Sequence, residues 1–139
     1  MTVSMKKGLP ALLFALLLSV VMIFNSAAAA TNQDYRIVKA DNPTQTSTAD
    51  GYAVKPASVA TDGVTTTLGF TTSFAYSINS LSISNDGGLT YTTYTGTTSG
   101  SVKSFTFPIY DFSTNTKAKI AVNVFGLYNM THDIEIEWN

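Results

Sequence analysis

The sequence predicts an all-β domain, and three features of residues 31–139 lead to this prediction. This stretch of 109 residues contains 20 Thr and 11 Ser, a composition that favours strands and turns over long helices. Short runs in which apolar and polar residues alternate recur along it, as half-buried strands require. Turn-forming Gly, Asn and Asp residues separate these runs. A disordered Ser/Thr-rich stalk is the alternative, but the eight Phe, seven Tyr and single Trp of the chain supply core-forming side chains that such a stalk lacks.

The first 30 residues differ in composition from the rest. An apolar run at 9–24 follows two lysines and leads into alanines with an Ala-x-Ala cleavage pattern, so we expect residues 1–30 to be a secretory signal peptide. The run is shorter than the roughly 20 residues that a membrane-spanning helix needs, which makes an uncleaved anchor the weaker alternative. With no Cys in the chain, a lipid-anchored lipoprotein is not expected. Residues 31–139 are expected to form a single domain.

Charge and composition argue against several classes of function. Residues 31–139 carry six basic and nine acidic side chains, a net charge of −3, whereas binding of nucleic acid or an anionic membrane needs a clustered basic face. The lack of Cys excludes zinc ribbons, iron–sulfur sites and thiol chemistry, and a single His, His132, excludes a multi-histidine metal site. The domain must also fold without disulfides, by packing alone.

The N-terminal half contains four expected strands. They lie at 35–40, 57–60, 64–70 and 78–84. The first precedes a polar stretch that is rich in turn residues. Asp62-Gly63 predicts a hairpin between the second and the third, because Asp-Gly favours tight turns. The fourth ends at a second set of turn residues, 85–88.

The C-terminal half contains four more expected strands. They lie at 89–95, 101–107, 119–125 and 131–138. Pro108 suits the end of a strand, because it has no backbone N–H. In the last run, the alternation assigns Thr131, Asp133, Glu135 and Glu137 to solvent and His132, Ile134, Ile136 and Trp138 to the core. Seven or eight short strands at spacings of roughly 8–12 residues predict an immunoglobulin-like β-sandwich.

Motifs for catalysis are missing from the sequence. It contains no Gly-rich phosphate loop and no Gly-x-Ser-x-Gly nucleophile motif. His132 and Asp133 are adjacent on a predicted strand and therefore face opposite sides, which prevents them from acting as a catalytic pair. Glu135 and Glu137 share a face that is expected to be solvated surface. We therefore expect this protein not to be an enzyme.

The residues around the start of the last strand are candidate ligands. Tyr128, Met130 and His132 have the parity of its buried residues, so they extend the inward face toward the rim of the sandwich. A tyrosine phenolate is a known axial ligand of haem iron, and a hydrogen-bonding group further along the same face would tune it. A buried tyrosine and a rim histidine without any ligand fit the same pattern. Periodicity alone does not choose between these interpretations.

Several segments together resemble the NEAT (near-iron-transporter) domain family. They are YRIVKAD from residue 35, STADGYAVKPA from residue 47, Asp62-Gly63 followed by a strand, and Tyr128-x-x-x-His132 before the closing strand. The resemblance covers nearly all of residues 31–139. It implies an immunoglobulin-like β-sandwich in which a short 3₁₀ segment forms one lip of a haem pocket and the last hairpin forms the other. It also implies haem capture at the surface of, or in secretion from, Gram-positive bacteria.

The resemblance assigns an iron ligand. The signature of the family is Tyr-x-x-x-Tyr, in which the first tyrosine ligates iron and the second hydrogen-bonds to the first. Tyr128 matches the ligand, and His132 takes the place of the second tyrosine. This departure introduces an imidazole, a group whose unperturbed pKa is about 6.5 and which can itself compete for iron. A tryptophan that is usual in the family is also absent, and Phe74 and Tyr76 are the nearest aromatic residues.

The resemblance also assigns contacts to the porphyrin. Ser47, Thr48 and Tyr52 fall on the lip segment, where the family binds the haem propionates and covers the distal face. Val122 and Val124 match apolar contacts below the porphyrin. The expected cofactor is ferric haem (protoporphyrin IX), and Tyr128 is the expected metal ligand.

The expected function is that of a secreted haemophore, which captures ferric haem and passes it on for iron acquisition. The expected partners are haem and, for haem transfer, haemoglobin or another NEAT protein. We expect no binding of nucleic acid and no insertion of the mature chain into a membrane. The expected location is extracellular, with association to the cell wall as a variant. Two alternatives stay open: a NEAT module that binds haemoglobin or another protein without ligating haem, and a structural or adhesive immunoglobulin-like domain.

Overall fold

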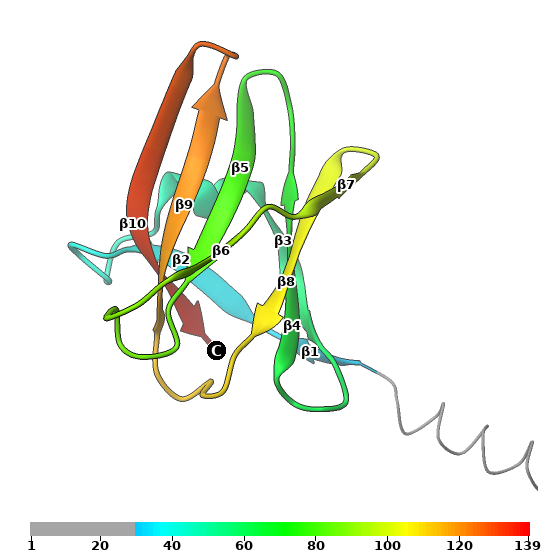
Figure 1. The fold of residues 1–139 in the computed structure, drawn as a ribbon, viewed down its shortest axis with the longest axis vertical. Helices are drawn as coiled ribbons and strands as arrows, with labels where there is room; N and C mark the ends of the chain where they lie inside the picture. Colours follow the sequence, from blue (N-terminus) through cyan, green and yellow to red (C-terminus); the bar gives the residue numbers. More distant parts are fainter. Residues whose placement is uncertain (1–29) are drawn as a thin grey trace, which may run out of the picture. The chain divides into compact units, whose positions relative to one another are not determined.

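The computed structural model describes residues 30–139, which form two antiparallel five-stranded sheets packed as a sandwich (Figure 1). One sheet has the order β1 (Thr31–Gln33), β3 (Ala53–Val59), β4 (Thr65–Thr71), β8 (Val102–Pro108), β7 (Thr97–Ser99). The other has the order β2 (Tyr35–Lys39), β10 (Tyr128–Trp138), β9 (Thr116–Val124), β5 (Tyr76–Ile83), β6 (Thr92–Tyr94). Between β2 and β3 the chain forms a 3₁₀ helix, η1 (Thr48–Tyr52). The prediction of an all-β sandwich with a short 3₁₀ segment is confirmed.

The described residues contain ten strands, more than the seven or eight expected. The additional strands β1 and β7 are polar triplets at the edges of one sheet, where each pairs with one neighbour only. The strand expected at 89–95 is shorter, because the carboxylate of Asp86 accepts hydrogen bonds from the N–H groups of Leu89 and Thr90 and holds them in the turn. As a result β6 begins only at Thr92.

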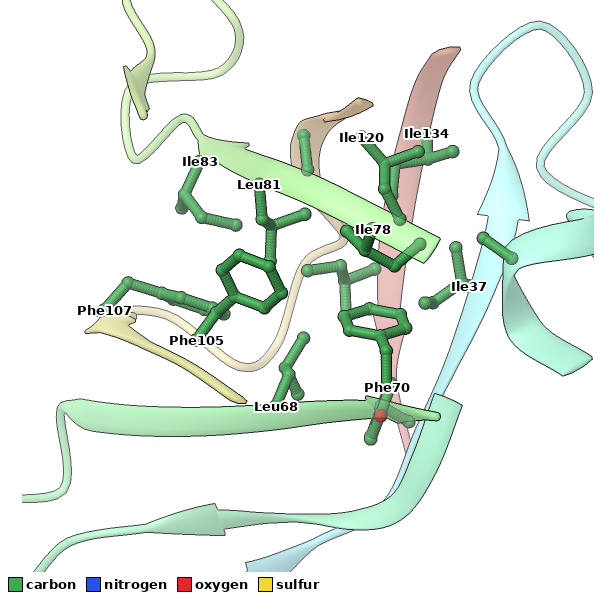
Figure 2. Close-up of a cluster of buried hydrophobic side chains, with 14 of the residues drawn as sticks. Ile37, Leu68, Phe70, Ile78, Leu81, Ile83, Phe105, Phe107, Ile120 and Ile134 are labelled. Carbon is green, nitrogen blue, oxygen red and sulfur yellow. The ribbon is translucent and has the colours of Figure 1, made fainter. Parts of the chain in front are cut away.

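The core lies between the two sheets (Figure 2). The inward residues of β4 and β8 meet those of β5, β9 and β10. The labelled side chains in Figure 2 from these five strands are Leu68, Phe70, Phe105, Phe107, Ile78, Leu81, Ile83, Ile120 and Ile134. All of them are buried, and burial of each such side chain stabilises the fold by roughly 1.5–3 kcal/mol. In β4, which matches the strand expected at 64–70, the alternate residues Thr66, Leu68 and Phe70 are fully buried.

Trp138, at the end of β10, was expected in the core and is only half-buried. Its ring packs against Tyr35 and Phe112, with ring centroids 6.0 and 5.0 Å away. Its Nε1–H donates a hydrogen bond of 2.9 Å to Oγ1 of Thr116. The indole therefore closes the rim of the sandwich, where its polar nitrogen finds a partner that the core does not offer.

Residues 31–139 form one compact unit, the sandwich itself. The predicted signal peptide, residues 1–30, lies outside the described residues except for Ala30, and it stays a prediction. Among residues 30–139, no helix is long and apolar enough to cross a membrane.

Candidate functional site

The hairpin of β9 and β10 places the predicted ligand residues. Its register pairs Tyr128 with Val124, Met130 with Val122 and His132 with Ile120. Directly paired residues in an antiparallel ladder project from the same face of the sheet. Ile120 and Val122 are fully buried on the inner face. The side chains of Tyr128, Met130 and His132 therefore project from the inner face, as their parity predicted.

Coverage of this inner face ends part-way along β10. Ile134 is 2% exposed, whereas Met130 is 47% and Tyr128 64% exposed. His132 was expected to be buried with Ile134, and this prediction is wrong, because His132 is exposed. The reason is that the space above His132 is an open cleft and not the core.

The cleft has a volume of about 790 Å³ and lies between the end of β2, the η1 segment and the β9–β10 hairpin. The floor of the cleft consists of Ile120, Val122 and Val124, and Ser47, Thr48 and Ala49 form one wall. The other lining residues are Tyr76, Lys39, Ala40, Asp41, Thr131, His132, Asp133 and Ile134. This volume falls within the roughly 300–1,000 Å³ of small-molecule and cofactor sites. An apolar floor with polar and charged groups around it suits a flat, largely apolar ligand that carries polar substituents.

The wall formed by η1 is fixed to β2. The N–H of Ser47 donates to the carbonyl of Ile37 (2.9 Å), and Oγ of Ser47 caps the 3₁₀ helix by accepting from the N–H of Ala49 (3.3 Å). The carboxylate of Asp50 accepts from the N–H of Ile37 (2.8 Å) and pairs with Nζ of Lys55 (2.8 Å). These contacts hold Ser47 and Thr48 at the edge of the cleft.

Tyr52 lies outside the cleft lining, although the resemblance places it on the lip. Its ring stacks on that of Tyr76, with centroids 4.0 Å apart and an angle of 14° between the planes. Tyr76 lines the cleft, and its burial and the nearby Tyr52 raise its pKa. From the sequence, Tyr76 is only one of two aromatic residues near the position of a tryptophan that is usual in the family. Tyr76 is recognised as a cleft residue through its pairing with Val124 on β9, and this pairing is known only from the strand register.

The tip of the hairpin is tightly turned. The N–H of Leu127 donates to the carbonyl of Val124 (3.1 Å), and Phe125 and Gly126 have φ of 54° and 69°. Two consecutive positive φ values are typical of a type I′ turn, and they are uncommon for a residue as large as Phe. The N–H of Phe125 donates to the carbonyl of Ala75 (3.2 Å), and its ring meets that of Phe74 edge-on at 6.3 Å. The tip is thus attached to the β4–β5 loop.

The structure brings most of the predicted site residues to one place. Ser47, Thr48, Val122, Val124 and His132 line the cleft. Tyr52 and Tyr128 do not line it, but each contacts or pairs with a residue that does, namely Tyr76 and Val124. The other residues of the lining include three at the end of β2, namely Lys39, Ala40 and Asp41, which lie close to β10 because β2 and β10 pair in one sheet.

Three side chains on the inner face of β10 can donate to iron: a phenol, a thioether and an imidazole, from Tyr128, Met130 and His132. Within residues 30–139, the structure contains no group of three or more His, Cys, Asp or Glu side chains arranged to hold a metal ion. The donors that the hairpin does present stand in one row beside an apolar floor.

The model of the NEAT family, described as the iron transport-associated domain, matches residues 27–139. The chain belongs to the NEAT family. Two solved NEAT structures share its fold. The NEAT5 domain of IsdX2, a B. anthracis hemophore, in complex with heme, superposes with a TM-score of 0.66 at 16% identity, covering 81% of this chain and 96% of that one. A mutant of the same domain in complex with heme gives 0.67 at 17% identity, covering 81% and 95%.

At these identities the likeness to the solved NEAT domains concerns the fold, and it confirms the immunoglobulin-like NEAT architecture. A comparison with curated proteins finds no significant match. The family assignment confirms the resemblance that the segments around Tyr35, Ser47 and Tyr128 indicated.

Proposed function

We propose that this NEAT domain binds ferric haem in the cleft beside the β9–β10 hairpin, with the phenolate of Tyr128 as the iron ligand. One observation carries the proposal. Tyr128 projects from the inner face next to Val124, a residue of the cleft lining, and its side chain is 64% exposed. A phenol at the outer end of an apolar floor is available to a metal that a porphyrin brings with it.

The cleft matches the two chemical characters of haem. The apolar floor of Ile120, Val122 and Val124 suits the porphyrin face, whose transfer from water is favourable in proportion to the apolar area removed. On the opposite wall, the hydroxyls of Ser47 and Thr48 suit the propionates, as the resemblance implies. The two solved domains that share this fold are themselves complexes with heme, which supports the same cargo here.

In this proposal His132 takes the position of the second tyrosine of the family signature. It lies on the same face of β10 as Tyr128 and lines the cleft. An imidazole in this position is able to hydrogen-bond to the phenolate or to ligate iron.

The wider role that we propose is that of a secreted haemophore, which captures haem and passes it on for iron acquisition. A cleft that is open at the rim, with a single proposed protein ligand for the iron, suits release as well as capture. The predicted signal peptide supports export, and retention at the cell wall is the variant. Haemoglobin as a source and another NEAT protein as an acceptor are the partners that this role requires.

The test is a titration of hemin into residues 31–139. The wild-type domain should give a Soret band that saturates at one hemin per chain. Tyr128→Phe should lose the phenolate signature and bind hemin at least about tenfold more weakly, a difference of about 1.4 kcal/mol. Tyr110→Phe, which changes a tyrosine of similar exposure (70%), is the matched control. Absence of a Soret band, or identical spectra for wild type and Tyr128→Phe, contradicts the proposal.

A second candidate is a NEAT module that binds haemoglobin without ligating haem. The observation in its favour is the exposure of Phe125 and Leu127 at the hairpin tip (55% and 79%) and of Phe74 in the adjacent β4–β5 loop (79%). Exposed aromatic residues of this kind are enriched in protein interfaces. Retention of haemoglobin by an immobilised domain that shows no Soret band with free hemin distinguishes this candidate from the first.

A further inference from the structure

Tyr76 and Tyr128 stand in one row across three strands. Tyr76 of β5 pairs with Val124 of β9, and Val124 pairs with Tyr128 of β10. All three therefore project from the inner face of the sheet. Two strand spacings place the Cα atoms of the tyrosines about 10 Å apart, whereas four residues along a strand separate the Cα atoms of Tyr128 and His132 by about 13 Å. The Cα atom of Tyr76 is therefore nearer to that of Tyr128 than the Cα atom of His132 is.

The ring of Tyr76 is held in place from two sides. Tyr52 stacks on it at 4.0 Å, which restricts the ring to one plane. The backbone on both sides is fixed by Ser73, whose N–H donates to the carbonyl of Tyr76 (3.0 Å) and whose Oγ accepts from the N–H of Tyr76 (3.2 Å). A hydroxyl on such a ring loses little freedom when it forms a hydrogen bond.

The hydroxyl of Tyr76 is available as a donor. The hydrogen bonds that Tyr76 makes within residues 30–139 use its backbone, and its side chain lines the cleft. Burial raises the pKa of Tyr76, as does the neighbouring Tyr52, so the hydroxyl keeps its proton at neutral pH. A protonated phenol is a donor that suits an anionic oxygen.

We infer that Tyr76 is a positioning residue that donates a hydrogen bond to the phenolate of Tyr128 when haem is bound. The inference rests on the proposed haem ligation. It assigns to a residue of β5, outside the Tyr-x-x-x-His segment, the part that the second tyrosine plays in the family signature. His132 then faces the cleft without being needed to support the phenolate.

The experiment compares ferric complexes of the wild-type domain with those of Tyr76→Phe, which keeps the ring and its stack on Tyr52. A hydrogen bond lowers the energy of the phenolate electrons. Its removal should move the phenolate-to-iron charge-transfer band to longer wavelength and lower the midpoint potential of the bound haem, because a stronger phenolate donor favours ferric iron. A purely structural role of Tyr76 would change the melting temperature and leave the band in place.

Two control variants make the result specific. Tyr52→Phe removes the hydroxyl of the other ring of the stack, outside the cleft lining, and should leave band and potential unchanged. His132→Gln tests the competing donor: if His132 supports the phenolate instead of Tyr76, the band shifts in this variant and not in Tyr76→Phe. A wild-type band in Tyr76→Phe, or a shift in His132→Gln alone, overturns the inference and leaves the proposed haem binding intact. Absence of any Soret band in the wild type overturns both.

Discussion

The two halves of β10 share one strand, one periodicity and one inner face, yet they differ in what covers them. From Ile134 to Trp138 the strand pairs with β2 on one side and, as far as Ile136, with β9 on the other, and the inner side chains Ile134 and Ile136 are buried. From Tyr128 to His132 it pairs with β9 alone, and its inner side chains are exposed. The difference teaches that the inner face of β10 is core near its C-terminal end and borders an open cleft near the hairpin.

The largest effect should come from the covered half. Ile136→Ala removes a fully buried side chain and should lower the free energy of unfolding by about 2–5 kcal/mol. Met130→Ala, on the same face of the uncovered half, should lower it by less than about 1 kcal/mol. Chemical denaturation of both variants measures the contrast. Equal losses for the two variants would show that the uncovered half is also part of the core.

An intermediate effect is expected where η1 borders the open half. Asp50→Ala leaves the buried N–H of Ile37 without its acceptor and should lower the free energy of unfolding by about 1–3 kcal/mol. It should also speed amide hydrogen exchange of the η1 residues, since the wall of the cleft loses its attachment to β2. Asp41→Ala, at an exposed residue that lines the same cleft, is the control and should change neither quantity. Unchanged exchange in Asp50→Ala would contradict the role of Asp50 as the anchor.

The smallest effect concerns the contribution of Asp86, in the turn between β5 and β6, to stability in acid. Hydrogen bonds from Thr90, and then from Ser84 and Leu89, lower the pKa of Asp86 to about 2. A carboxyl with a lower pKa in the folded than in the unfolded state stabilises the fold above its unfolded pKa of about 4 and loses this contribution as the pH falls toward 2. Asp86→Asn should therefore show a shallower loss of stability between pH 4 and pH 2, measured by thermal unfolding. His132→Gln, at the open end, should leave this acid limb unchanged.

The fold was predictable from sequence where one face of a strand is buried. In β4, the alternation of Thr66, Leu68 and Phe70 is a direct consequence of burial between two sheets. The triplets of β1 and β7 were missed, because edge strands made of polar residues bury no face and leave no period in the sequence. Their presence depends on pairing with β3 and β8, which is a long-range property.

The candidate site was predictable in part. Parity was sufficient to place Tyr128 and His132 on the inner face of β10, but not to show that this face is uncovered there. The resemblance indicated Ser47 and Thr48, which the η1 contacts do hold at the cleft. Tyr76 was not identified, because its place in the cleft follows from the pairing of β5 with β9, a strand that is distant in sequence.

The short strands at the sheet edges affect how readily copies of this domain associate at high concentration. Three of the four outermost strands, β1, β7 and β6, have only three residues each. On the outer side of β2, the N–H of Lys39 and the C=O of Ile37 bond to the segment before η1, and the N–H of Ile37 bonds to Asp50 of η1. Long, open edges invite strand addition between molecules and the growth of fibrils, and these four outermost strands are too short or too well occupied to serve as templates. The edge of β10 from Tyr128 to His132, which pairs with β9 alone, lies beside the cleft.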